Sequence, residues 1–205
     1  MRVMVVEADR GDANRAVQKL EAARHEVLRC HEQGLGPFPC NGLMDPATCP
    51  LAVGVDVALT VRRVPWRTPT PSEDGAICAV RAGVPLVVTG TTQVNPFAPW
   101  AEAAVEEMDV VAGCEQAATA GYRRAVAAVR SALRSLDPDA GVSVIRADNG
   151  LRVGLDLASG VDGHRAALAA VAAVRETLPN VVTIDVSVRD RGADCDGAAE
   201  SSAHR

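Results

Sequence analysis

The chain has 205 residues, enough for one large domain or for a domain with a smaller companion, and its 48% hydrophobic content suffices for a buried core. Its net charge of −5 argues against the basic face that nucleic acid requires, so we expect no nucleic-acid partner. No run of 18 apolar residues and no signal-peptide core occurs, so we expect a cytoplasmic protein without a membrane span. In that reducing compartment the six cysteines are expected to be free thiols or ligands rather than disulfides.

Short apolar runs alternate with amphipathic stretches over the first two thirds of the chain. Buried strands are predicted by the runs at 2–6, 25–30, 55–61, 84–88 and 109–112. Helices are predicted at 12–24, with Asp12 as the N-cap, and at 73–82, 100–107 and 115–136. This alternation predicts a parallel, doubly wound five-stranded sheet, a flavodoxin-like α/β fold over residues 1–136. Glycines and prolines in residues 31–53 predict an irregular insertion after the second strand.

A change of pattern at Asp137-Pro138-Asp139-Ala140-Gly141 predicts a domain boundary. Beyond it, two alternating runs around Asn149-Gly150 predict a β-hairpin, and a helix at 163–178 and a strand at 181–188 follow. The resulting β-β-α-β module, residues 142–188, is small, so we expect it to pack on the first domain or on a second copy of itself. The polar residues 189–205 predict a disordered tail.

Several segments in succession carry a family resemblance. They read V-V-E-A-D with A-R-H-E-V, then V-D-V-A-L-T-V-R-R-V-P, then E-D-G-A-I-C-A-V-R-A-G-V-P-L-V-V-T-G, and finally M-D-V-V-A-G. Their order and spacing resemble the receiver domain of two-component response regulators, over about two thirds of the chain. The resemblance implies an acidic pair that binds magnesium, an aspartate nucleophile at the exit of the third strand, a Ser or Thr after the fourth strand, and a Lys after the fifth.

Carried over position by position, most of these receiver groups are replaced. The acidic pair becomes Glu7 and Ala8, the nucleophile becomes Val61, the hydroxyl is kept as Thr89, and the lysine position falls at Ala112. A shift of one residue would put Thr60 or Arg62 at the nucleophile position, and neither restores the chemistry. Phosphoryl transfer depends on positioned charge, so we expect no aspartyl phosphate on this degenerate receiver, or pseudo-receiver. Glu7 and Asp9 either still bind a cation or are solvated acids at a strand end.

The leading hypothesis is therefore a non-enzymatic regulatory or protein-interaction protein in signal transduction, with a protein partner or a second copy of itself. The C-terminal segments L-R-V-G-L-D-L and A-L-A-A-V-A-A-V-R-E-T-L-P-N-V-V-T-I-D-V-S-V are similar to the small cytoplasmic domain of cation-efflux transporters and to alkaline-shock-type proteins. That similarity implies an association module. An enzyme is a further alternative. Gly90-Thr91-Thr92 could form an anion-binding loop, but no G-x-G-x-x-G or Walker pattern supports a nucleotide site.

A second hypothesis rests on the insertion, where Cys30, His31, Cys40 and Cys49 follow one another. Thiolates and imidazole are preferred ligands of zinc and of iron–sulfur clusters. No C-x-x-C motif occurs, so a metal or cluster site, a redox thiol pair and unligated thiols all remain open. The alternative function is a metal, iron–sulfur or thiol redox sensor, with His31 or Cys78 as the fourth ligand. Cys78 and Cys114 are otherwise expected to be buried small hydrophobes.

Overall fold

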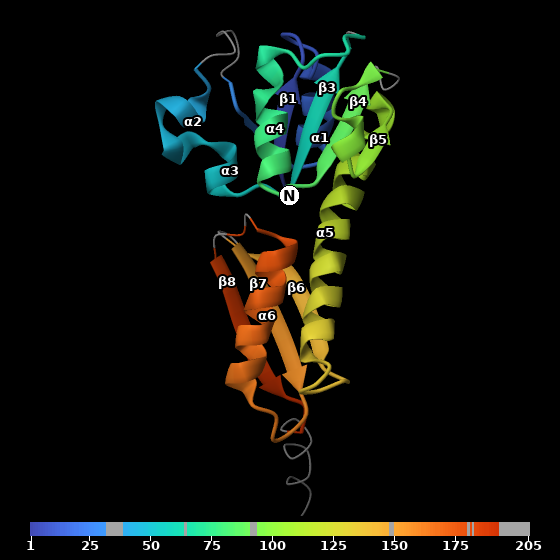
Figure 1. Cartoon of the computed structure of the whole chain (residues 1–205). Helices are drawn as coiled ribbons and strands as arrows, with labels where there is room; N and C mark the ends of the chain where they lie inside the picture. The colour runs from blue at the N-terminus through green and yellow to red at the C-terminus, as the bar shows by residue number, and fades with distance from the viewer. Residues whose placement is uncertain are drawn as a thin grey trace, which may run out of the picture. The chain divides into compact units, whose positions relative to one another are not determined.

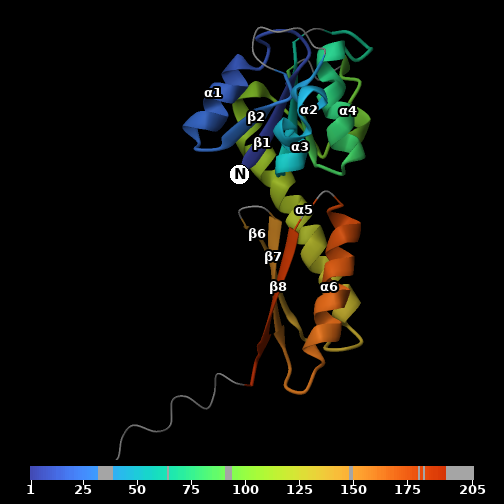
Figure 2. The ribbon, with the colours of Figure 1, turned by 90° about the vertical axis from the view of Figure 1, so that its left-hand side faces the viewer.

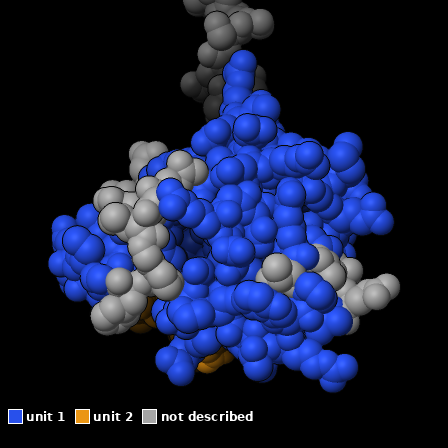
Figure 3. All heavy atoms as spheres, turned by 90° about the horizontal axis from the view of Figure 1, so that it is seen from above, with its two compact units in different colours: residues 1–121, 178–180 blue, residues 122–177, 181–205 orange. Residues whose placement is uncertain are grey.

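The computed structural model describes residues 1–31, 39–63, 65–90, 94–147, 150–179, 181 and 183–192. The chain divides into two compact units, one of residues 1–121 with 178–180 and one of residues 122–177 with 181–205 (Figure 1; Figure 3). The division falls inside the helix α5 (Val110–Leu133), whereas the sequence predicted a boundary at 137–141.

The first unit contains a five-stranded sheet in which every pair of neighbouring strands is parallel. Its strands are β1 (Arg2–Glu7), β2 (Glu26–Arg29), β3 (Val57–Arg62), β4 (Leu86–Gly90) and β5 (Ala103–Val105). The spatial order is β2-β1-β3-β4-β5, which is compatible with a flavodoxin-like doubly wound sheet. The predicted parallel α/β architecture is thereby confirmed.

Helices cover both faces of this sheet. Because alternate residues of a strand point to opposite sides, each strand contributes side chains to a core on either face. On one face, Val5 and Val61 pack in a single core with residues of α1 (Asn14–Ala22) and α5. On the other face, Met4 and Ala58 pack with residues of α4 (Asp74–Arg81). The insertion after β2 holds the short elements α2 (Asn41–Met44), η1 (Pro46–Thr48) and α3 (Pro50–Val53). Three further short turns are η2 (Pro71–Glu73), η4 (Ala98–Trp100) and η5 (Glu107–Asp109).

The region around β5 differs from the sequence prediction, which placed a helix at 100–107 and a strand at 109–112. The fifth strand is Ala103–Val105, and the backbone N–H of Glu102 donates to the Leu86 carbonyl at 2.7 Å just before it. The apolar run at 109–112 instead opens α5, because Val110, Cys114 and Ala117 recur at helical spacing and are buried in the core. Ala112 therefore lies in a helix and not at a strand exit.

The start of α1 is also different from the prediction that Asp12 caps it. Ala13 is the N-cap residue and makes no side-chain cap bond. Glu7 Oε2 accepts the backbone N–H groups of Gly11 and Ala13, each at 3.1 Å. The Asp12 carboxylate accepts the N–H of Arg63 at 3.2 Å instead, so it links the exits of β1 and β3.

The second unit has the predicted β-β-α-β order (Figure 2). Strands β6 (Gly141–Ala147) and β7 (Gly150–Leu157) are antiparallel, and β8 (Thr183–Asp190) pairs with β7 in parallel. Helix α6 (Gly163–Thr177) packs on β7 and β8 through a buried stripe that includes Ala166, Ala170 and Val174. Asp148 and Asn149 of the predicted turn lie outside the described residues, as do residues 193–205 of the predicted tail, although Arg189 and Asp190 complete β8. Among the described helices, none is long and apolar enough to cross a bilayer.

Asp137 ties together the loops of this second unit. Its Oδ2 accepts the N–H of Ala158 at 2.8 Å and Arg191 Nη2 at 2.6 Å, and its Oδ1 accepts the N–H of Asp139 at 3.1 Å. The Ala158 N–H above all, and then Arg191 and Asp139, hold the pKa of the Asp137 carboxyl below its ordinary value, while desolvation opposes them. The ionised carboxylate is therefore preferred in the folded state.

Replacement of Asp137 should change the pH dependence of the second unit. Because the folded pKa lies below the unfolded value of about 3.9, the carboxylate stabilises the unit above about pH 4 and loses this effect as the pH falls through the folded pKa. We expect Asp137→Asn to flatten the acid-induced loss of hydrogen-exchange protection at the β7 and β8 amides. Asp139→Asn, an exposed position in the same loop, is the control. An equally steep acid loss in wild type and Asp137→Asn would contradict the assignment.

Candidate functional site

The carboxyl ends of β1, β3, β4 and β5 form one row at the edge of the first sheet. Glu7 pairs in register with Val61, Val61 with Thr89, and Thr89 with Val105. Open α/β sheets bind their ligands outside this edge. The structure therefore brings Glu7, Val61 and Thr89, three of the residues singled out in the sequence, into neighbouring positions.

Val61 occupies the position of the expected nucleophile but is only 1% exposed. Its side chain packs in the core with Val5 of β1 and Val17 of α1. Its carbonyl accepts the N–H of Ala8 at 3.0 Å, which joins the ends of β1 and β3. The side chain offers no oxygen and is not open to a phosphoryl donor.

Thr89 and the two acids have separate surroundings. Thr89 is 0% exposed, and among the described residues its Oγ1 has no hydrogen-bond partner. Besides its two backbone N–H donors, Glu7 has Arg29 Nη1 at 3.4 Å from Oε1. Asp9 is exposed, and its Oδ1 accepts the N–H of Arg10 at 2.7 Å. The Glu7 carboxylate is thus engaged by N–H donors and by a guanidinium, which disfavours the cation site considered for Glu7 and Asp9.

The lysine position of the receiver pattern needs a correction as well. Because β5 ends at Val105, the residue that follows it is Glu106, an acid, and not Ala112. Lys19, the single lysine of the chain, lies in α1 and donates from Nζ to the Glu107 carbonyl at 2.8 Å. The carboxylate of Glu107 accepts Arg63 Nη2 at 2.7 Å. Lys19 and Arg63 are therefore both engaged with Glu107 of η5.

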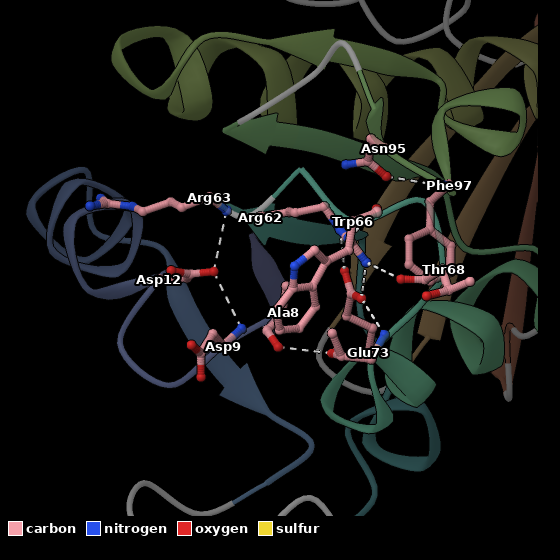
Figure 4. A network of polar contacts seen from close by, with 11 residues as sticks. Ala8, Asp9, Asp12, Arg62, Arg63, Trp66, Thr68, Glu73, Asn95 and Phe97 are labelled. Carbon is pink, nitrogen blue, oxygen red and sulfur yellow. Dashed lines mark hydrogen bonds and ion pairs between the residues drawn. The ribbon is translucent and has the colours of Figure 1, made fainter.

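The edge also carries an ion pair that the sequence did not predict, between Arg62 at the end of β3 and Glu73 (Figure 4). Both side chains are 0% exposed. Arg62 Nε donates to Glu73 Oε1 at 3.1 Å, and Nη2 donates to Glu73 Oε2. Nη1 donates to the Trp66 carbonyl at 2.6 Å and Nη2 to the Thr68 carbonyl at 3.1 Å. The guanidinium thus holds the loop after β3 at two of its carbonyl groups.

Glu73 and Thr70 complete this network. Glu73 Oε2 accepts the N–H of Thr70 at 2.8 Å, as part of a capping box at the start of η2. Thr70 Oγ1 donates to the Ala8 carbonyl at 2.8 Å. The loop between β3 and α4 is therefore fastened to the exits of both β1 and β3. No spacing rule links an arginine at a strand end to a glutamate eleven residues later, so the pair has no recognisable sequence signal.

A second group of side chains lies around the insertion after β2. It consists of the thiols of Cys30, Cys40 and Cys49 and, from α4, Cys78, and we call it the thiol cluster. Burial above all, and then the charges of Cys49, Cys40 and Cys78, raise the pKa of Cys30 to about 12. Burial, followed by Cys40 and Cys49, also raises the pKa of the Cys78 thiol. Cys114 is separate, since it lies in α5 and in the core on the other face of the sheet, and burial raises its pKa to about 12. Thiols with raised pKa values react slowly as nucleophiles.

His31 lies next to the thiol cluster in the chain. Burial lowers the pKa of its imidazole, against the opposing charges of Asp74 and Glu7. Both ring nitrogens are buried, and neither has a hydrogen-bond partner in the described part of the chain. Within the same described residues, no three His, Cys, Asp or Glu side chains already form a group that could hold a metal ion. Thr91 and Thr92 of the predicted anion loop lie outside the described residues.

Breaking the Arg62–Glu73 pair should destabilise the first unit strongly. Glu73→Ala leaves a buried guanidinium without its counter-charge, for which we expect a loss of about 3–5 kcal/mol in the free energy of unfolding. The double variant Arg62→Met with Glu73→Leu removes both charges and should lose less. Denaturant unfolding followed by the fluorescence of Trp66 and Trp100, both in the first unit, measures this. A loss below about 1 kcal/mol for Glu73→Ala, the range of an exposed pair, would contradict the buried pair.

Comparison with known proteins adds no assignment to this geometry. No family model matches the chain, and no curated protein matches it significantly. The functional conclusion therefore depends on the side chains at the sheet edge and in the thiol cluster.

Proposed function

We propose that the protein is a receiver-like regulatory or interaction protein that does not accept a phosphoryl group. The observation that carries the proposal is the buried Val61 in the row between Glu7 and Thr89. A receiver would present a carboxylate at this position. Here the row keeps one acid and one hydroxyl, and its centre is apolar.

The closed loop after β3 supports the same conclusion. Phosphoryl transfer is catalysed almost entirely by positioned charges around the phosphate. At the exit of β3 the positive charge of Arg62 is neutralised by Glu73, and its remaining donors are bonded to loop carbonyls. This guanidinium is therefore not available to a phosphate. For a chain without a phosphoryl acceptor at this position, we propose association with a protein as the mode of action.

Incubation with acetyl phosphate and Mg²⁺ tests the first part of the proposal. We expect intact-mass spectrometry to find no phosphoryl adduct that hydroxylamine removes, because the acceptor position in the row is occupied by Val61 and not by a carboxylate. Val61→Asp should not gain an adduct either, since the lysine and the second acid are also missing. An active receiver domain, treated in parallel, controls the reagent. An acid-labile phosphate on the wild-type chain contradicts the proposal.

For the second part, we propose a second copy of the chain as the partner, bound through the open face of the second sheet. This face lies opposite α6 (Figure 2). Its residues alternate along each strand with the more buried residues that face α6. Its middle row is Ser143, Gly154 and Ser187, which pair in register across the three strands. These small residues allow another sheet to approach closely.

Charges of opposite sign flank this middle row in a self-complementary pattern. Two residues before it in β7 and β8 stand Arg152 and Asp185, and two residues after it stand Asp156 and Arg189. Their exposed ion pairs within the sheet are long, at 3.6 Å and 4.0 Å. A two-fold axis that runs parallel to the middle row, between the two facing sheets, sets Arg152 of one protomer against Asp156 of its partner, and Asp185 against Arg189. Two-fold interfaces require this kind of self-complementarity.

A charge swap separates this dimer from the fold. Arg152→Asp with Asp185→Arg preserves the net charge and the ion pair within the sheet, but sets like charges against each other across the two-fold axis. We expect dimerisation to weaken at least about tenfold in sedimentation equilibrium. Adding Asp156→Arg and Arg189→Asp should restore the dimer. A wild type that stays monomeric at high concentration, or a double variant that dimerises normally, refutes the interface.

A further inference from the structure

Four segments of the first unit bring the thiol cluster together. Cys30 follows β2 at the sheet edge, Cys40 precedes α2, Cys49 precedes α3, and Cys78 lies in α4. The N–H of Asn41 donates to the Cys30 carbonyl at 2.9 Å, which holds the start of α2 against the end of β2. This backbone hydrogen bond brings Cys40, the neighbour of Asn41, close to Cys30.

Two glycines make room for the sulfur atoms. A Cβ atom at Gly75 of α4 would lie 2.8 Å from Cys30 Sγ, and a Cβ atom at Gly42 of α2 would lie 2.8 Å from Cys49 Cβ and 3.2 Å from its Sγ. Neither glycine has a positive φ angle, so the backbone conformation does not require glycine at either position. What both positions share is a cysteine side chain in the space that a larger residue would fill.

The exposure of the four thiols increases from the interior to the surface. Cys30 is buried, Cys40 and Cys49 are half-buried, and Cys78 is exposed. All four are free thiols. An ion from solvent can therefore reach the outer thiols first, while the inner thiol is shielded from water on the α4 face of the sheet.

We propose that Cys30, Cys40, Cys49 and Cys78 bind one thiophilic metal ion of the zinc class. Four thiolates are a common ligand set of tetrahedral structural zinc sites. Each thiol loses its proton to solvent on binding, and no oxidant or reductant takes part. Among the described residues the thiols do not already form a coordination group, so the site requires the cysteine side chains to rotate about χ1 and close around the ion. His31, whose buried ring nitrogens are unpartnered among the described residues, lies beside the site as its nearest imidazole in the sequence.

The number of thiols favours a metal ion over a redox disulfide pair. A disulfide would join only two of the thiols. It would not use the other two, nor the space that Gly42 and Gly75 leave beside Cys49 and Cys30. A metal ion uses all four. The position, at the exit of β2, is independent of the row formed by Glu7, Val61 and Thr89, so this inference and the proposed function can fail separately.

Titration of the full-length, reduced protein with Co²⁺ under anaerobic conditions tests the site. We expect near-ultraviolet thiolate-to-cobalt absorption that saturates at one ion per chain and disappears when Zn²⁺ is added. Cys49→Ser and Cys78→Ser, at half-buried and exposed positions that tolerate serine, should each weaken binding at least about tenfold. Gly42→Ala should weaken it as well, because the new methyl group displaces the Cys49 side chain.

Cys114→Ala and Cys195→Ala are matched controls and should bind as the wild type does. Cys114 lies in the other core, and Cys195 lies outside the described residues. Circular dichroism of every variant checks that the fold is retained. The proposal is overturned if no thiolate-to-cobalt absorption appears, or if Cys49→Ser and Cys78→Ser bind as tightly as the two controls. A reduced protein that binds no cobalt, but forms a disulfide between two of the four thiols on mild oxidation, also overturns it, in favour of a redox pair.

Discussion

The ion pair between Arg62 and Glu73 determines how the functional edge of the first unit is built. Removing two charges from water is costly, and the attraction between them offsets this only when the remaining donors and acceptors are bonded. Here the guanidinium reaches the carbonyls of Trp66 and Thr68, and the carboxylate accepts the N–H of Thr70. The pair therefore fixes the path of the loop between β3 and α4, and Thr70 in turn holds that loop to β1 through the Ala8 carbonyl.

Most of the fold follows from local sequence, and the exceptions have a common physical cause. The strands β1, β3 and β4 are buried on both faces, so each appears as an unbroken apolar run. The edge strand β5 has three residues among good helix formers, and only its pairing with β4 makes it a strand. The run that opens α5 is too short for its period to distinguish a strand from a helix. Tertiary contacts decided both cases: pairing with β4 made β5 a strand, and burial of one helical face in the core made residues 110–112 the start of α5.

The candidate sites divide in the same way. Glu7, Val61 and Thr89 each end a parallel strand, so their meeting at one edge was predictable from the order of elements. The partner of Arg62 depends on how a proline-rich loop returns to the sheet, which no local pattern encodes. The place of Cys78 in the thiol cluster depends on which side of α4 faces β2, and the glycine at position 75 is the only local sign of that contact.

The alternation of side chains along β3 explains why no free nucleophile or ligand stands at its exit, whereas a cysteine follows β2. Val61 points into the core beneath α1 and α5. Arg62 points to the opposite face, where it forms an ion pair with Glu73. Neither face of β3 presents a free nucleophile or ligand at its end. At the end of β2 the same alternation sets Cys30 on the α4 side, where Gly75 leaves space for its sulfur, and the insertion supplies Cys40 and Cys49 from outside. The thiols of the cluster therefore lie two strands to the side of the expected site, at the edge of the sheet, where a long insertion can be accommodated without disturbing the central strands.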